Sequence, residues 1–302
     1  MAIKNVAIVG GTHGNELIGV YLLKRWEQMP QELMRPTLRT ELFLGNPKAN
    51  ELNRRFIDED LNRSFLHTSL EAEKISYEAH RAAYLNQKIG PKGASQFDFV
   101  IDLHTTTSNS GAMVILFDTN PFNLHVAAYI IQQLPGAKIH FIPPSGGDSP
   151  YLNSICPQGL AVEIGPIPQA LLRSDIFDLT NAVVRHSLDY ANAVNLGQKI
   201  DLPDSIEVFR SEEIIYFPQE NGVFSAIVHK DLQDADYQEI NTGDPMFETL
   251  TGEIIFYEGT ETVYPVFINE AAYYYKGIAM TLCSKEILSL VPEPAYTLDD
   301  KF

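Results

Sequence analysis

Short apolar runs alternate with stretches of helical periodicity through the first 195 residues of the chain. Apolar runs bounded by Gly, Pro or polar residues predict strands at residues 5–10, 40–44, 97–103, 112–117, 137–142 and 160–164. Apolar positions spaced three or four residues apart predict helices at residues 15–28, 70–87, 122–134 and 169–194. Alternating strands and helices are typical of an α/β fold, so we expect a mostly parallel or mixed sheet with flanking helices on both faces.

The pattern changes after residue 200. Short β-rich runs separated by turn residues follow there, without a long helical pattern, at residues 208–217, 222–229, 252–257 and 262–268. We therefore expect two domains, an α/β domain at residues 1–200 and a smaller β-rich domain at residues 205–302 that caps the active site. Residues 47–66 have weak periodicity and many polar side chains, which predicts a long functional loop.

Two of the predicted strands are followed by side chains that commonly bind metals. His13 and Glu16 lie in the turn after the first strand, and His104 follows the strand at residues 97–103. The carboxyl ends of neighbouring parallel strands meet at one edge of a sheet, where α/β active sites usually form. Three nitrogen and oxygen ligands leave one coordination position open, as in a catalytic zinc site. We therefore expect a metal hydrolase with one Zn²⁺ per chain.

Other polar side chains complete a hydrolytic site. Glu163 lies at a strand end between apolar neighbours, where it is either a surface residue or the proton acceptor beside a metal-bound water, with a raised pKa. Arg63 follows Asn62, and a guanidinium beside an amide is suited to binding a carboxylate. Asp102 shares a strand face with His104, so it either orients that ligand or is an ordinary core or surface residue.

Composition narrows the class of partner. The 302-residue chain has a formal net charge of −17, which makes nucleic acid and anionic membranes poor partners, so a small-molecule substrate is expected. Two distant cysteines, Cys156 and Cys283, suit a reducing compartment. The beginning of the chain shows no signal-peptide pattern and no apolar run reaches membrane-spanning length, so we expect a cytoplasmic protein. The oligomeric state is left open, with a homodimer as one option.

Five segments, in order along nearly the whole chain, closely resemble motifs of the aspartoacylase family. They are GTHGNE at residues 11–16, DEDLNR at 58–63, DLHTTT at 102–107, VEIGP at 162–166 and YPVFINEAAYY at 264–274. The family consists of zinc hydrolases related in fold to zinc carboxypeptidases and to succinylglutamate desuccinylase. The resemblance therefore implies hydrolysis of the amide bond of N-acyl amino acids, with N-acetyl-L-aspartate as the first candidate substrate.

The resemblance also implies a role for individual residues. His13, Glu16 and His104 would hold zinc, and Glu163 would activate water. Arg55 would polarise the scissile carbonyl, whereas the substrate would be bound by Asn62, Arg63 and, from the second domain, Tyr273.

One position departs from the family. Members that hydrolyse N-acetylaspartate carry an arginine ten residues before the catalytic glutamate, for the second carboxylate of the substrate, and Asn153 stands there in this chain. Lys276 or Arg54 could substitute for that charge. Side-chain selectivity and the acyl group are therefore left open.

Three alternatives compete with this interpretation. A nucleotide-binding protein is disfavoured because the glycine spacing around Gly10 and Gly14 fits neither a dinucleotide fingerprint nor a phosphate-binding loop. A zinc-holding protein without activity would need neither Glu163 nor the loop arginines. A desuccinylase, a carboxypeptidase-like hydrolase or a deacylase of other N-acyl amino acids would use the same mechanism, and the loop arginines do not separate these from an aspartoacylase.

Overall fold

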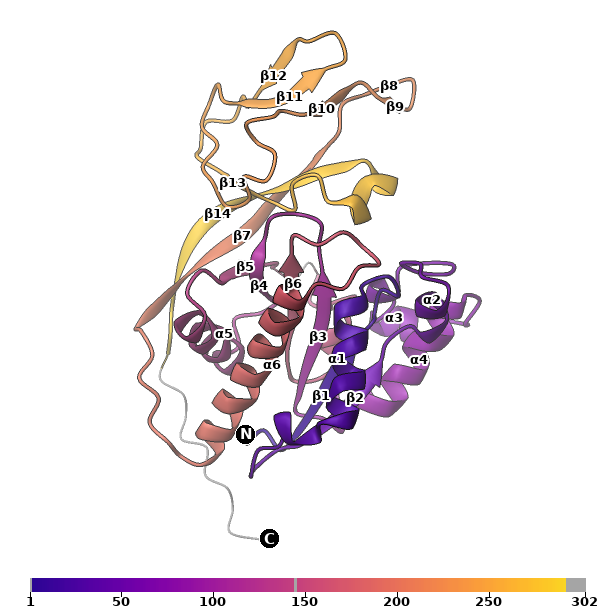
Figure 1. Ribbon diagram of the computed structural model, residues 1–302, viewed down its shortest axis with the longest axis vertical. Coiled ribbons are helices and arrows are strands. Elements are labelled where there is room, and N and C mark those ends of the chain that lie inside the picture. The colour runs from indigo at the N-terminus through magenta and orange to yellow at the C-terminus, as the bar shows by residue number, and fades with distance from the viewer. Residues whose placement is uncertain (1, 144–145, 292–302) are drawn as a thin grey trace.

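The computed structural model describes residues 2–143 and 146–291, and a nine-stranded mixed sheet forms its centre (Figure 1). The strands lie in the order β13-β14-β7-β5-β4-β6-β3-β1-β2. Their bounds are β1 Asn5–Gly10, β2 Arg39–Leu44, β3 Phe99–Thr105, β4 Gly111–Leu116, β5 Lys138–Phe141, β6 Gln158–Gly165, β7 Ser205–Tyr216, β13 Tyr264–Val266 and β14 Ile278–Ser289. The β2-β1-β3-β6 block is parallel, whereas β4 runs antiparallel to β6, and β14 runs antiparallel to both β7 and β13.

Helices cover both faces of this sheet because its strands are apolar on both sides. Ile8 packs into one hydrophobic core, and its neighbours Ala7 and Val9 pack into another. The helices α1 Leu17–Gln28, α5 Pro121–Gln133 and α6 Ser174–Asn195 cover the first face. The helix α4 Tyr77–Ile89 and the 3₁₀ turn Leu152–Ile155 cover the second face next to β1 and β3. Short helices α2 Pro47–Glu51 and α3 His67–Glu71 precede α4.

The C-terminal part of the chain forms a smaller β structure above the carboxyl ends of the central strands (Figure 1). It contains the sheet β10 Ala226–Val228, β11 Pro245–Thr249 and β12 Ile254–Phe256, and the hairpin β8 Gln219–Glu220 with β9 Val223–Phe224. The long strands β7 and β14 pass through both parts and join the central sheet through a short parallel pairing of β7 with β5. The division between residues 200 and 205 stays a prediction, and residues 292–302 of the expected second domain lie outside the described residues.

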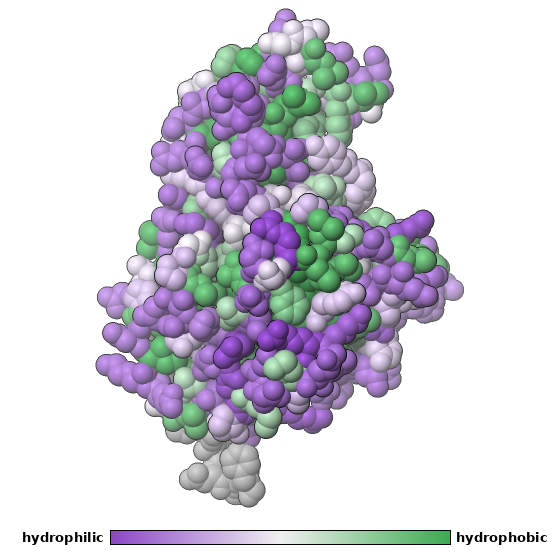
Figure 2. All heavy atoms as spheres, in the orientation of Figure 1, coloured by the Kyte–Doolittle hydropathy of each residue, from purple (hydrophilic) through white to green (hydrophobic). Residues whose placement is uncertain are grey.

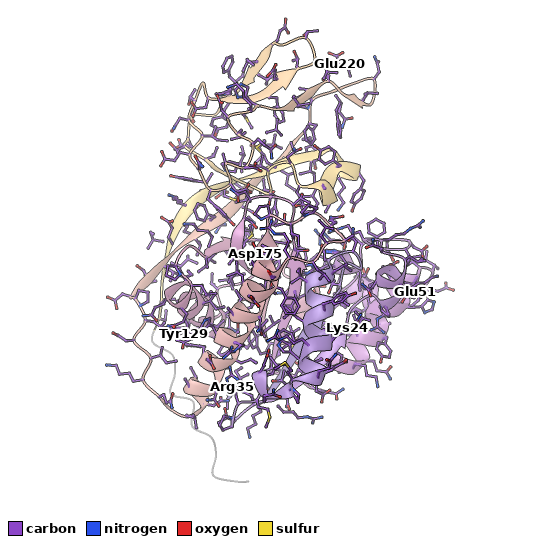
Figure 3. The ribbon with its side chains drawn as sticks, in the orientation of Figure 1. Lys24, Arg35, Glu51, Tyr129, Asp175 and Glu220 are labelled. Carbon is purple, nitrogen blue, oxygen red and sulfur yellow. The ribbon has the colours of Figure 1, made fainter. Side chains whose placement is uncertain are left out.

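The two parts meet at the end of the sheet where the polar strand-end residues lie. Figure 3 labels Asp175 in the first turn of α6 near this junction, Glu220 at the far tip of the C-terminal part and Arg35 at the opposite end of the molecule. The face in Figure 2 is mostly hydrophilic, in keeping with the high charge. Within residues 2–143 and 146–291, no helix has the length and apolar character needed to cross a membrane.

Several predicted elements differ from the structure. The predicted helix 70–87 is interrupted after Glu71, because the Lys74 ammonium binds the last carbonyl groups of α3 and the Ser76 hydroxyl accepts a hydrogen bond from Ala79 N at the start of α4. The first helix begins two residues later than predicted, at Leu17, and the helix predicted from residue 169 begins five residues later, at Ser174. The predicted loop at residues 47–66 contains the short helix α2 and a 3₁₀ turn at Leu61–Arg63. The strands β11 and β14 have no counterpart among the predicted elements, and in the twelve-residue β14 two register shifts interrupt the two-residue alternation that marks a strand.

Candidate metal centre and active site

Three predicted metal ligands meet at the carboxyl ends of β1 and β3. Glu16 Oε1 lies 2.7 Å from His13 Nδ1, and Glu16 Oε2 lies 2.9 Å from His104 Nδ1. The two Nδ1 atoms are 3.2 Å apart, and all three side chains are buried. Within the described part of the chain, this is the one group of three His, Cys, Asp or Glu side chains close enough to hold a metal ion. A cation fits the donor set, because two imidazole nitrogens and a carboxylate face one another at a buried point.

The glycine-rich turn that carries His13 packs directly on the short helix α2. A Cβ at Gly14 would lie 2.2 Å from the carbonyl carbon of Ala49, so no other residue fits there without a shift of backbone. Gly14 O accepts a hydrogen bond from Asn50 Nδ2, and Gly14 N donates one to Arg55 O. The close approach of two chain segments therefore accounts for this glycine without a bound phosphate.

Each histidine of the cluster contacts a buried carboxylate through its other ring nitrogen. His104 Nε2 lies 2.8 Å from Asp102 Oδ2, and the Thr12 hydroxyl donates to Asp102 Oδ1 over 2.6 Å. His13 Nε2 lies 3.1 Å from Asp60 Oδ1. Such a contact fixes the tautomer and the ring orientation of a ligand. The structure therefore places Asp102 as the orienting interpretation expects, whereas the contact of Asp60 with His13 is additional to what the sequence indicates.

Arg55 lies between two carboxylates, that of Glu16 in the His–Glu–His cluster and that of Asp60 in the loop. Its Nη1 lies 3.2 Å from Glu16 Oε1 and its Nη2 lies 3.3 Å from Asp60 Oδ2. Burial alone would lower the pKa of Arg55, but the charges of Glu16 and Asp60 raise it, so the side chain stays protonated. Its Nε is buried without a hydrogen-bond partner.

Glu163 lies on β6 directly beside the candidate ligand His104. The two residues are Cα partners in the parallel pairing of β3 with β6, so their side chains lie on the same face of the sheet. Burial raises the pKa of Glu163 well above its usual range, and the negative charge of Glu16 raises it further. A carboxylate with a raised pKa is suited to accepting a proton near neutral pH.

The residues predicted to bind substrate line the same cavity, which has a volume of about 540 Å³. Asn62 Oδ1 accepts a hydrogen bond from Leu152 N, which fixes the amide, and Arg63 Nη1 donates to Asn62 O. The Arg63 guanidinium lies over the Tyr151 ring at 4.7 Å. Tyr273 enters from the 3₁₀ turn Ala271–Lys276 of the C-terminal part, with the Arg55 guanidinium 6.0 Å from its ring centre. The structure thus brings together all eight predicted site residues.

Two further buried carboxylates hold the loops of the site. Glu78 on α4 is fully buried and accepts hydrogen bonds from the backbone N–H groups of residues 57, 58 and 59 at 2.7, 3.0 and 3.3 Å, and from Asn46 Nδ2 at 2.9 Å. Glu270 accepts from Thr107 N at 2.7 Å and from the Thr106 hydroxyl. Neither the role of Glu78 nor that of Glu270 could be predicted from the sequence, because each depends on contacts between distant segments.

The position that departs from the family motif lies beside a different cavity. Asn153 is buried and lines a smaller cavity of about 250 Å³ together with Lys92 and Asp148. Of the two proposed substitutes for the missing arginine, Lys276 lines the large cavity and Arg54 does not. Lys276 is therefore the better placed cation.

Comparison with known proteins places the chain in a family. Residues 2–191 match the succinylglutamate desuccinylase/aspartoacylase catalytic domain, and residues 204–285 match the AstE/AspA barrel-sandwich hybrid domain. The chain belongs to this family. It is 43% identical over 290 residues to a probable aspartoacylase of Acaryochloris marina, covering 95% of this chain and 98% of the relative.

Other relatives carry a second activity in their names. The human N-acyl-aromatic-L-amino acid amidohydrolase is 40% identical over 303 residues, covering 98% of this chain and 95% of the relative. The crystal structure of murine aminoacylase 3 superposes with a TM-score of 0.92 at 40% identity, covering 96% and 98% of the two chains. These findings confirm the expected α/β fold with its C-terminal β part. They also support the prediction that this protein is a hydrolase.

Proposed function

We propose that this protein is a zinc-dependent amidohydrolase that cleaves the amide bond of N-acyl amino acids. The observation that carries the proposal is the presence, in one cavity, of the cluster His13, Glu16 and His104 beside Glu163 and Arg55. Zn²⁺ bound by the cluster would supply Lewis acidity and a water molecule of lowered pKa. A zinc-holding protein without activity would need neither of the last two residues.

The protein side chains would carry out proton transfer, stabilise the carbonyl oxygen and bind the substrate. Glu163 accepts a proton from the attacking water and transfers it to the amide nitrogen as the C–N bond breaks, giving a carboxylic acid and a free amine. Arg55 donates hydrogen bonds to the carbonyl oxygen as negative charge develops on it. Asn62 and Arg63 bind the α-carboxylate of the substrate, and Tyr273 contacts the substrate from the C-terminal part.

The amino acid that is released is the least constrained part of the proposal. N-acetyl-L-aspartate is the first candidate, and Lys276 is the lining cation left for its second carboxylate. N-acyl-aromatic amino acids are the second candidate, because Tyr151 and Phe117 pack at 4.4 Å between ring centres and both line the cavity. Without the family's arginine at Asn153, we expect N-acetylaspartate to be hydrolysed with only a weak preference over neutral N-acyl amino acids.

A hydrolysis panel tests this proposal. It compares N-acetylated aspartate, glutamate, asparagine, leucine and phenylalanine with N-succinylglutamate and a C-terminal dipeptide, on protein of measured metal content. We expect near-stoichiometric zinc and turnover of the N-acetyl amino acids, with both lost after chelation. Full zinc retention in a His13→Ala, His104→Ala double variant would refute the metal site, and turnover of the dipeptide alone would indicate a carboxypeptidase.

We further propose that the protein acts in the cytoplasm on small molecules. Cys156 and Cys283 are both buried and unpaired, as expected of a reducing compartment. The net charge of −17 supports the absence of nucleic-acid and membrane partners. Whether the chain forms a homodimer stays open, and sedimentation of the purified protein would decide it.

A further inference from the structure

The catalytic cavity extends well beyond the reacting groups, across three more strands of the sheet. Glu163 lies on β6, and the lining continues over Ile115 on β4 and His140 on β5 to Ser211 on β7. Neighbouring strands are about 4.8 Å apart, so His140 lies on the order of 10 Å across the sheet from the Glu163 strand. An acetyl group is far too short to span that distance.

The near part of this extension is apolar and its far end is polar. Ala161, Ile115 and His140 are Cα partners across β6, β4 and β5, so their side chains form one row on the same face. Beyond the two apolar residues, His140 Nε2 lies 2.8 Å from Ser211 Oγ. The Phe267 ring packs edge-on against the imidazole at 5.7 Å. A chain lying across this row would thus meet methyl groups first and hydrogen-bonding groups last.

The His140–Ser211 pair is uncharged. Burial lowers the pKa of His140 to about 3, so the imidazole is neutral under physiological conditions. Its other ring nitrogen, Nδ1, lies 3.8 Å from Cys283 Sγ, and burial raises the pKa of that thiol, which keeps it protonated. A serine hydroxyl has one donor and two acceptor positions, so the bond to His140 leaves Ser211 able either to donate or to accept another hydrogen bond.

The charges around the pair disfavour an anion. Glu212 and Glu213 follow Ser211 on β7, are exposed, and line the same cavity. Among the described residues, the lining lysine and arginine side chains are Arg55, Arg63 and Lys276, and none of them lies on β4, β5, β6 or β7. Arg210 on β7 lies 3.6 Å from Glu212 Oε1 and does not line the cavity, so a carboxylate brought to Ser211 would lie beside like charges without a lining cation on the same strands.

We propose that His140 and Ser211 form a distal subsite that binds an uncharged hydrogen-bonding group, such as a hydroxyl or carboxamide, at the end of a substrate substituent that crosses Ile115. The substituent is either the acyl chain or the amino acid side chain, since both extend from the scissile amide. This inference rests on the proposed amidohydrolase function and narrows its substrate class. It also disfavours N-succinyl substrates, whose acyl chain ends in a carboxylate.

Matched substrate pairs test the subsite in two arms. The acyl arm compares N-(5-hydroxypentanoyl)-alanine with N-pentanoyl-alanine and N-glutaryl-alanine. The side-chain arm compares N-acetyltyrosine with N-acetylphenylalanine. In the arm that uses the subsite, we expect the hydroxyl compound to have a kcat/KM about two- to tenfold above its apolar partner, as one net hydrogen bond provides. The glutaryl compound should be the poorest of the acyl arm.

Two variants separate recognition from a structural role. Ser211→Ala and His140→Phe should each abolish the ratio between polar and apolar partners while both partners are still hydrolysed. Ser284→Ala is the control, because it removes a hydroxyl from the facing strand β14 that does not itself line the cavity, although it donates to Glu212, which does. It should leave the ratio unchanged.

The results discriminate between the two proposals. If His140 and Ser211 only join β5 to β7, the variants will lower the melting temperature and leave the kcat/KM ratio of each substrate pair as in the parent. That result would overturn the subsite proposal. Equal rates within both pairs in the parent also overturn it, although hydrolysis of the panel would still support the amidohydrolase. No hydrolysis of any compound would overturn both.

Discussion

Asp60→Asn tests whether the Asp60 carboxylate orients His13 and positions Arg55. The Asp60 carboxylate lies 3.1 Å from His13 Nε2 and 3.3 Å from Arg55 Nη2, and it accepts a hydrogen bond from Asn62 N at 2.9 Å. Burial alone would raise the pKa of Asp60, but the charge and hydrogen bond of His13, together with Arg55, hold it well below its usual range. Asparagine keeps the size of the side chain and removes its charge.

The expected loss has two separate parts. Removing the orienting partner of a metal ligand typically weakens metal binding about 10- to 100-fold, so the zinc dissociation constant should rise by that factor. Arg55 keeps its contact with Glu16 but loses its second carboxylate, so its guanidinium is less well positioned. Since losing one oxyanion donor outright costs about 10²–10³ in kcat, a displaced donor should cost roughly tenfold at saturating zinc.

The two parts are measured in separate assays. Competition with a chromophoric chelator gives the zinc dissociation constant, and initial rates at saturating zinc give kcat. Asp58→Asn is the matched control, since Asp58 belongs to the same acidic run but is exposed and accepts a hydrogen bond from Tyr77 N. If Asp60→Asn bound zinc as tightly as Asp58→Asn and kept the parent kcat, the orienting role of Asp60 would be refuted.

Three further substitutions test other parts of the site. Glu163→Gln should lower kcat by about 10²–10⁴-fold or more with zinc content and melting temperature unchanged, and activity within a few-fold of the parent would contradict its role as proton acceptor. Arg63→Lys keeps the charge but loses the planar fork, so steady-state kinetics should show a raised KM with a smaller change in kcat. Glu78→Gln places an amide N–H against backbone donors and should lower both kcat and melting temperature. The control Leu85→Ala, elsewhere on α4, should lower the melting temperature alone. Equal kcat values in the two variants would exclude a positioning role for Glu78.

The candidate metal ligands could be predicted from the sequence because they lie at or shortly after the carboxyl ends of two strands. A buried parallel strand is recognised by its local apolar run, and its carboxyl end fixes where the next side chains lie. His13, Glu16 and His104 therefore come together once β1 and β3 pair in register. Glu163 follows from the same rule, because β6 is the next strand of the same parallel block.

The contacts between loops and ligands could not be predicted in the same way. Asp60 lies in an acidic run that is as well explained by solvation as by burial, and only the folded chain brings it to His13, 47 residues away. Glu78 is one acidic residue among several near the start of a helix, and its sequence context does not distinguish a buried carboxylate from an exposed one. Pairing over such distances depends on tertiary packing, which periodicity does not report.

Glu78 and Glu270 are buried carboxylates that each accept hydrogen bonds from backbone N–H groups of a loop. The segments that carry Arg55 and follow His104 are largely irregular, so their backbone N–H groups lack the partners that a helix or sheet would provide, and buried donors must be bonded. A carboxylate offers several acceptor positions at one point, so one buried side chain can hold consecutive N–H groups and fix a loop without secondary structure. The loops beside the candidate site are thereby held by side chains from α4 and from the C-terminal part, which explains how these loops can keep a defined geometry.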